Sequence, residues 1–204
     1  MLQARLPLLL TWRRVALLLL AGSVGGALCD QIHVQFGVLA YPRHDVFGQA
    51  WWVGPNFGLA TLVMYAATWL WASRCERAQP GPVTDREVIQ HTAWFLGAYV
   101  ASALLQGQPK LLALVYGLLF LRRVLPRADA PWLALHGVGL AIGGTSFEAV
   151  LAATGAFHYN QPDLWTVPLW LPGVYLHGAP LAMAVLRRMR TGAQQDAPLC
   201  QVVD

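Results

Sequence analysis

WRRVALLLLAGSVGGAL, at residues 12–28, sets two arginines directly before an apolar run. The run continues to Val34, and its length suits a transmembrane helix, which needs about 20 predominantly apolar residues. Such a start also resembles a secretory signal sequence. Because five further apolar segments follow it, we interpret residues 15–34 as an uncleaved first span rather than a leader.

The basic residues of the whole chain repeat this arrangement. Twelve of the fourteen fall into four clusters of three, and long apolar stretches separate the clusters. In chain order the basic residues are Arg5, Arg13 and Arg14; Arg43; Arg74, Arg77 and Arg86; Lys110; Arg122, Arg123 and Arg127; and Arg187, Arg188 and Arg190. Because basic residues are retained on the cytoplasmic side of a membrane, this alternation predicts six crossings with both termini in the cytoplasm.

Composition supports an all-α integral membrane protein, a six-transmembrane-helix bundle without an attached soluble module. Of the 204 residues, 56% are hydrophobic and 12% are charged, whereas soluble domains carry about 25% charged residues. We expect a cytoplasmic N-terminus at residues 1–14, a membrane domain at 15–190 and a disordered cytoplasmic tail at 191–204. The expected spans are residues 15–34, 49–72, 87–105, 111–125, 132–154 and 164–186. Nothing in this plan provides a nucleic-acid partner or a site for a cofactor.

Residue composition is the evidence for the kind of organism that encodes the chain and for the membrane in which it lies. Arginine outnumbers lysine thirteen to one, and alanine and leucine are abundant, which favours a bacterial genome rich in G and C. The predicted location is the inner (plasma) membrane in a bacterium, or the endoplasmic reticulum in a eukaryote.

Local signals mark helix ends and helix contacts. Thr84 followed by Glu87 has the pattern of a capping box and predicts a helix start. Pro172 falls inside the expected sixth span, where it should remove a backbone hydrogen bond and kink the helix. Small residues spaced by four suit close helix packing or an oligomer contact. They are Gly22 with Gly26, Gly139 with Gly143, and Gly97 with Ala101. The sequence shows no convincing internal repeat.

Glu148 is the clearest candidate for a functional group within a span. It lies sixteen residues after Trp132, about 24 Å along a helix, in the outer half of the bilayer. A carboxylate among lipid tails is costly, so Glu148 should face the protein interior, be protonated, or both. Three interpretations remain: a helix–helix hydrogen bond to Ser, Thr or Trp, an anchor for a lipid head group, or a proton relay. His177 should lie at another depth, as a neutral histidine hydrogen-bonded between helices.

Several histidines and aspartates gather at the expected outer ends of the spans. They are Asp30, His33, His44, Asp45, His158 and Asp163. Such groups can hold a transition metal, yet no HExxH or HxxxH pattern occurs, so we predict no metal site.

Two tryptophan motifs carry a resemblance to a known family. Tyr159-Asn160-Gln161-Pro162-Asp163, followed by Trp170-Leu171-Pro172, resembles the segment before and within the last helix of Insig (insulin-induced gene) proteins. Residues 50–55, Ala-Trp-Trp-Val-Gly-Pro, are similar to the opening of the second Insig span. Arg86-Glu87 and residues 101–105 are similar to the start and end of the third. The resemblance extends from about Trp12 to Met189.

The resemblance implies a non-enzymatic six-helix membrane protein that binds a sterol and regulates membrane-protein partners. In animals, Insig proteins bind oxysterols, retain Scap and help mark HMG-CoA reductase for degradation. Asp163 matches the regulatory Pro-Asp carboxylate of the family's last outer loop. This chain departs from the family at Pro168, where the family has Arg, and at Ala149, where it has a polar Gln; the charge here is Glu148.

We therefore expect an Insig-like protein that binds an apolar lipid, sterol or diacylglycerol-like, in an intramembrane cavity, with a regulatory rather than catalytic role. The candidate lipid-binding residues are Glu148, Asp163, Trp170, Pro172, Trp51, Trp52 and Ser102. A homo-oligomer is also expected. One alternative is an intramembrane enzyme for a lipid or isoprenoid, with Glu148, Asp163, His158 or His33 as acid and base. Another is a scaffold for a second membrane protein, with Trp165 and the glycine faces as its contact surface.

Overall fold

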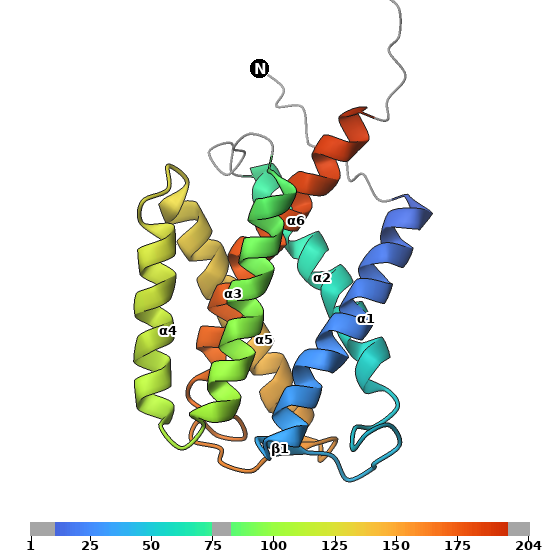
Figure 1. The fold of residues 1–204 in the computed structure, drawn as a ribbon, viewed down its shortest axis with the longest axis vertical. Coiled ribbons are helices and arrows are strands. Elements are labelled where there is room, and N and C mark those ends of the chain that lie inside the picture. Colours follow the sequence, from blue (N-terminus) through green and yellow to red (C-terminus); the bar gives the residue numbers. More distant parts are fainter. Residues whose placement is uncertain (1–10, 75–82, 196–204) are drawn as a thin grey trace, which may run out of the picture.

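The computed structural model describes residues 11–74 and 83–195, and within them the chain forms six helices and one small sheet (Figure 1). The helices are α1 (Trp12–Gln35), α2 (Val53–Arg74), α3 (Asp85–Leu104), α4 (Pro109–Val124), α5 (Ala130–Ala153) and α6 (Leu171–Gln195). The strands β1 (Leu39–Ala40) and β2 (His158–Tyr159) pair antiparallel at one end of the bundle, here called the sheet end. The all-α fold class is confirmed.

Helix starts follow the local signals only in part. Thr84 accepts a hydrogen bond from the Glu87 backbone N–H, and the Glu87 carboxylate accepts one from the Thr84 backbone N–H at 2.9 Å. This confirms the capping box at the start of α3. The start of α2, in contrast, comes at Val53, four residues later than expected, because the chain first forms a tight loop.

The sixth helix corrects two expectations. It begins at Leu171, seven residues later than expected, so Pro172 lies in its first turn, where a missing N–H costs nothing. The predicted kink at Pro172 is therefore wrong, and the proline inside α6 is Pro180. Helical structure continues past Thr191 to Gln195; the rest of the predicted disordered tail, and residues 1–10, lie outside the described residues.

A repeated two-helix unit organises the bundle, which contradicts the expectation of no internal repeat. The bounds of α1 and α5 differ by 118 residues at both ends, and the starts of α2 and α6 differ by the same 118. Figure 1 shows α1 and α5 both descending toward the sheet, while α2 and α6 return from it. The two units, α1–β1–α2 and α5–β2–α6, thus run in the same direction, and α3 and α4 are inserted between them in the chain.

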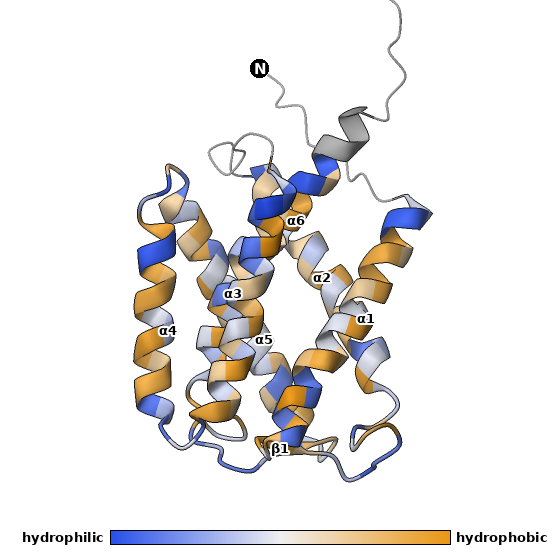
Figure 2. Ribbon diagram, in the orientation of Figure 1, coloured by the Kyte–Doolittle hydropathy of each residue, from blue (hydrophilic) through white to orange (hydrophobic). Residues whose placement is uncertain are grey.

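Apolar residues cover the outside of the helices as well as the core. Figure 2 shows hydrophobic residues along the middle of the helices and hydrophilic ones toward their ends. Large exposed apolar side chains include Leu17, Leu20, Leu28, Leu114, Leu118, Leu135, Ile142 and Val150. Among the described residues, α1 and α5 are long and apolar enough to cross a membrane by length and composition. Six crossings therefore remain a prediction.

Candidate functional site

A small cavity opens between the two repeated units near the sheet end, and we call it the repeat cavity. Its volume of about 40 Å³ would hold one or two small polar groups rather than a whole lipid. Its walls are mainly aromatic and aliphatic, with two carboxyl groups and an amide among them. The lining residues are Asp30, Tyr41, Trp52, Val53, Asn56, Phe57, Ala60, Phe147, Glu148, Leu151, Phe157 and Tyr175.

Glu148, on α5, faces the repeat cavity and is held by two tyrosines. The Tyr175 hydroxyl donates a hydrogen bond to Oε1 at 2.5 Å, and the Tyr159 hydroxyl donates a short one to Oε2. Both donors come from the same repeated unit as Glu148. This arrangement agrees with the expected inward orientation, although the partners are tyrosines rather than Ser, Thr or Trp.

Asp30, on α1, is the second carboxyl group of the cavity. It is buried, and its Oδ2 accepts hydrogen bonds from the Tyr41 hydroxyl at 2.9 Å and from Gln49 Nε2 at 2.8 Å. Burial raises the pKa of Tyr41 and of Tyr159, both of which lie in the connections beyond the helices. Their hydroxyls therefore stay protonated and serve as donors to the two carboxyl groups.

A polar and aromatic layer lies behind the cavity, where α3 meets the repeated units. The Ser102 hydroxyl donates to the Tyr99 carbonyl at 2.9 Å, so its oxygen accepts from His33 Nε2, also at 2.9 Å. The His33 ring stacks on Tyr99 with a centroid distance of 4.9 Å, and it meets Trp170 edge-on with a centroid distance of 5.5 Å. This layer connects α1 and α3 with the residue directly before α6.

The predicted lipid-binding residues separate into three groups. Glu148 and Trp52 line the cavity. Trp170 and Ser102 are fully buried behind it, and Trp170 packs at a centroid distance of 6.2 Å against Tyr159, whose hydroxyl donates to Glu148. The remaining three do not line the cavity: Asp163 and Trp51 are exposed, and Pro172 lies in the first turn of α6.

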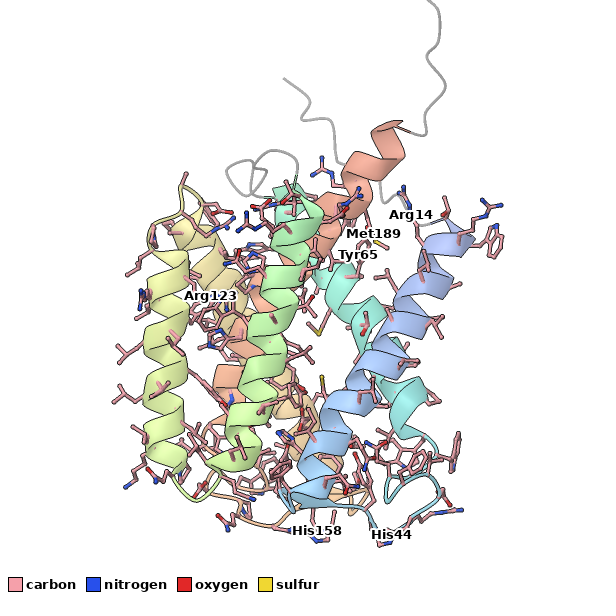
Figure 3. All side chains as sticks on the ribbon, viewed as in Figure 1. Arg14, His44, Tyr65, Arg123, His158 and Met189 are labelled. Carbon is pink, nitrogen blue, oxygen red and sulfur yellow. The ribbon has the colours of Figure 1, made fainter. Side chains whose placement is uncertain are left out.

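The histidines and aspartates predicted to gather at the outer ends of the spans do not form one cluster. Asp30 and His33 are buried with separate partners, whereas Asp45 pairs with Arg43 at 3.4 Å. Figure 3 shows His44 and His158 at the sheet end of the molecule. No group of three metal-binding side chains comes together in the described part of the chain.

Sequence reasoning missed the tyrosines that hold the carboxyl groups. Tyr41 follows Asp30 by eleven residues, and Tyr159 follows Glu148 by eleven residues. That shared spacing was the available signal. Tyr175 and Asn56 carry no comparable signal, because only the folded helices bring them to the cavity.

A second polar cluster lies between α3, α4 and α6, farther from the sheet end than the repeat cavity (Figure 3). Arg123 donates hydrogen bonds to Nδ1 of His177 at 2.7 Å and to Nδ1 of His91 at 2.8 Å, and its guanidinium lies 4.9 Å from the Trp94 ring centre. Because arginine can only donate, both Nδ1 atoms must be acceptors, so both histidines are neutral. His177 is therefore the interhelical histidine that the sequence predicts.

Comparison with solved structures identifies the fold. No family model matches the chain, and no curated protein matches it. Two crystal structures do match, those of the mycobacterial Insig homologue MvINS from Mycobacterium vanbaalenii and of a cross-linked MvINS trimer. Each gives a TM-score of 0.63 at 23% sequence identity. The match covers 89% of this chain and 95% of the former, and 90% of this chain and 97% of the latter. The chain therefore has an Insig-like fold.

Proposed function

Starting from this Insig-like fold, we propose that the protein is a member of the Insig family that binds an apolar lipid with a small hydroxylated head in the repeat cavity. The observation that carries the proposal is the placement of Asp30 and Glu148 in a cavity with otherwise mostly apolar walls. In this proposal the protein senses or regulates, and does not transform its ligand.

A membrane location follows from the surface of the bundle. Monomeric soluble proteins rarely expose contiguous apolar patches of more than a few hundred Å², whereas leucine, isoleucine and valine side chains cover the outer faces of α1, α4 and α5. At the end opposite the sheet, Arg127 and Arg187 hold Asp129, and Arg188 pairs with Asp85. We propose that this arginine-rich end is cytoplasmic and that all six helices cross the membrane.

The chemistry of the cavity selects the ligand head. Among the described residues that line it there is no Lys, Arg or His, so an anionic phosphate would find no counter-ion. The carboxyl groups instead favour a head that donates hydrogen bonds. The volume accommodates only the head, so the lipid tails would lie along the apolar helix faces outside. A diacylglycerol or a sterol hydroxyl fits this description.

The enzyme alternative lacks a matching geometry. Asp163, His158 and His33 do not line the cavity with Glu148, and the first two are exposed in the connection before α6. An acid and a base for one substrate should lie within hydrogen-bond reach of the same reacting group. Binding is therefore the function that the arrangement supports best.

A homo-oligomer belongs to the same proposal. Gly22 and Gly26 pack against α2, where a Cβ would meet Thr61 or Phe57, but nothing lies within 4 Å of a Cβ at Gly139 or Gly143. The latter pair therefore offers a small-residue face for another helix. The trimeric state of the solved MvINS structure is consistent with such an assembly.

Organic extraction of the detergent-purified protein, followed by mass spectrometry, tests the proposed function. We expect one class of neutral hydroxylated lipid to be enriched far above its share of the membrane. Glu148→Leu should lose that lipid. Glu87→Gln is the matched control, because Gln also completes a capping box, and it should retain the lipid. A lipid profile equal to that of the bulk membrane, or an unchanged profile in Glu148→Leu, would refute the proposal.

A further inference from the structure

The two repeated units match in backbone detail, beyond the helix bounds. Gly37 and Gly155 have positive φ values of 63° and 78°, and they are 118 residues apart. Phe47 and Trp165 also have positive φ values, 48° and 57°, at the same separation. Left-handed backbone is rare outside glycine, so its recurrence at equivalent positions indicates one loop design used twice.

Hydrogen bonds in these loops repeat at the same offset. Val46 bridges to Gln49 in the first loop, as Leu164 bridges to Val167 in the second. The backbone N–H of Asp45 also donates to the Gln49 carbonyl at 2.9 Å, and the backbone N–H of Asp163 donates to the Val167 carbonyl at 3.1 Å. Helix packing repeats too: a Cβ at Gly26 would meet the Phe57 ring, and a Cβ at Gly144 would meet the Tyr175 ring. All of these pairs are 118 residues apart.

The carboxyl groups of the cavity are equivalent residues of the two units. Asp30 and Glu148 are 118 residues apart, and so are Tyr41 and Tyr159, the tyrosines that donate to them. Each unit therefore supplies one carboxyl group held by its own tyrosine. Antiparallel pairing of β1 with β2 relates the two units by a local two-fold axis, which brings both carboxyl groups to one cavity.

Helix α3 makes the two sides of the local axis different in the described part of the chain. On one side of the local axis α3 contacts both α1 and α6, and the His33–Ser102 hydrogen bond joins α3 to α1. On the other side α2 contacts α5 directly, and the cavity remains open there. The pseudo-symmetric pair thus faces a single ligand position.

The remaining hydrogen-bonding capacity of the pair is for accepting. Among the described residues, both hydrogen bonds to Asp30 go to Oδ2, which leaves Oδ1 available. Each Glu148 oxygen takes one hydroxyl and has a second lone pair. The tyrosine hydroxyls of the cavity are already directed at these groups. Ionised carboxyl groups can only accept, so a ligand that satisfies both ionised groups must supply two donors.

We propose that Asp30 and Glu148 form a paired carboxyl site, one group from each repeat, that takes a lipid head with two hydrogen-bond donors, such as a glycerol diol. This inference rests on the proposed function and narrows it. It predicts that Asp30 binds the ligand head as directly as Glu148 does. It also predicts that a lipid with a diol head binds with higher affinity than a lipid with a single hydroxyl.

Three ether lipids with one octadecyl chain test the proposal, because they differ at the head alone, where each hydroxyl is either free or methylated. They are 1-O-octadecylglycerol, its 2-O-methyl ether and its 2,3-di-O-methyl ether. Binding to the delipidated full-length protein would be measured in detergent by isothermal titration. We expect the affinity to fall by about tenfold with each hydroxyl removed, since the loss of one hydrogen bond has about this effect. In Asp30→Asn and in Glu148→Gln, the diol should lose most of its advantage over the 2-O-methyl ether.

Controls separate this inference from the proposed function. Asp45→Asn changes a carboxyl group of the first repeat that does not line the cavity, and should preserve the full ranking. Equal binding of all three lipids, or an unchanged ranking in Asp30→Asn, would overturn the paired site while leaving a lipid cavity in place. Failure of all three lipids to bind, together with an extracted lipid profile equal to that of the bulk membrane, would reject the proposed function itself. If a variant does not fold, the wild-type ranking alone still decides.

Discussion

Gly144 contributes to the candidate site because the absence of a side chain there leaves room for the Tyr175 ring. A Cβ at this position would lie 2.2 Å from the Tyr175 ring, whose hydroxyl donates to Glu148. Gly144→Ala should displace the tyrosine, lower the free energy of unfolding by about 1–3 kcal/mol and reduce lipid retention. Unfolding in mild detergent and lipid extraction measure the two effects.

The control for this prediction is another helical glycine. Nothing lies within 4 Å of a Cβ at Gly97, so Gly97→Ala should leave the lipid in place and stabilise the protein by at most about 1 kcal/mol through helix propensity. Equal behaviour of the two variants would show that Tyr175 is not held as described.

At this scale the sequence revealed the charged residue but not its partners. Glu148 could be selected because a carboxyl group is costly inside a span. Tyr175 could not, because a tyrosine in an apolar segment has many roles, and its contact depends on the packing of α6 against Gly144. Asp163 and Trp51 were selected by resemblance alone, and the fold leaves both exposed.

One arginine of α4 bonds to two neighbouring helices at once. Arg123 bonds to histidines of α3 and α6, whereas Arg122 is exposed. Lysine cannot serve both acceptors with its single ammonium group in the way that a guanidinium fork does. Arg123→Lys should therefore lower the free energy of unfolding by about 2 kcal/mol, and Arg122→Lys should have almost no effect. Denaturant titration of the two variants decides, and similar curves would contradict the interhelical role.

The start of α5 is pinned by Asp129, which bonds to Arg127 at 2.8 Å and to Arg187 at 2.7 Å. Burial raises the pKa of Asp129, but the two arginines outweigh burial and lower it below its ordinary value. A lowered folded-state pKa stabilises the fold above the unfolded value near 3.9, and this contribution is lost as pH falls through the folded pKa.

Asp129→Asn should consequently destabilise the protein most above about pH 5. The difference from the wild type should shrink as pH falls below about 4, where the unfolded wild-type carboxyl becomes protonated. Unfolding free energies measured between pH 6 and pH 3 in one detergent test this. A difference that is constant over the range would mean that the ion pairs do not contribute.

Element boundaries were predictable where the chain carries its own cap. Thr84 and Glu87 fixed the start of α3 from sequence, because a capping box is local. The start of α6 was not predictable in this way. The apolar run from Leu164 continues into the helix, but the backbone at Trp165 is left-handed and the helix begins only at Leu171. Hydropathy does not register such a turn.

At the scale of the whole molecule, the described bundle is a pair of two-helix repeats with an inserted hairpin, and neither hydropathy nor the pattern of basic residues indicates the repeat. Equivalent residues such as Asp30 and Glu148 share chemistry, and the identical pairs, such as Gly37 with Gly155 and Tyr41 with Tyr159, are few and scattered. The six apolar segments and the alternation of basic residues could be predicted because each is a local feature that can be read from the sequence without the fold. The repeat became visible only through backbone geometry and pairing of β1 with β2.

The proposed topology predicts which residues reagents can reach from outside intact cells. A cysteine introduced as His44→Cys or His158→Cys should react with a membrane-impermeant maleimide, because both positions lie at the sheet end. A cysteine introduced as Arg122→Cys, in the exposed last turn of α4 at the opposite end, should react only after permeabilisation, and the buried Cys29 should remain protected. Labelling of Arg122→Cys in intact cells would contradict the six-span arrangement.

Photocrosslinking in native membranes is the most direct test of an intramembrane lipid site. A diacylglycerol analogue with a diazirine near its head would be activated in cells, and the adducts mapped by peptide mass spectrometry. We predict adducts concentrated on the α2 and α5 residues around the repeat cavity, near Phe57 and Phe147, with loss of these adducts in Glu148→Leu. Adducts spread evenly over the lipid-facing helices, and unchanged in that variant, would contradict a specific site.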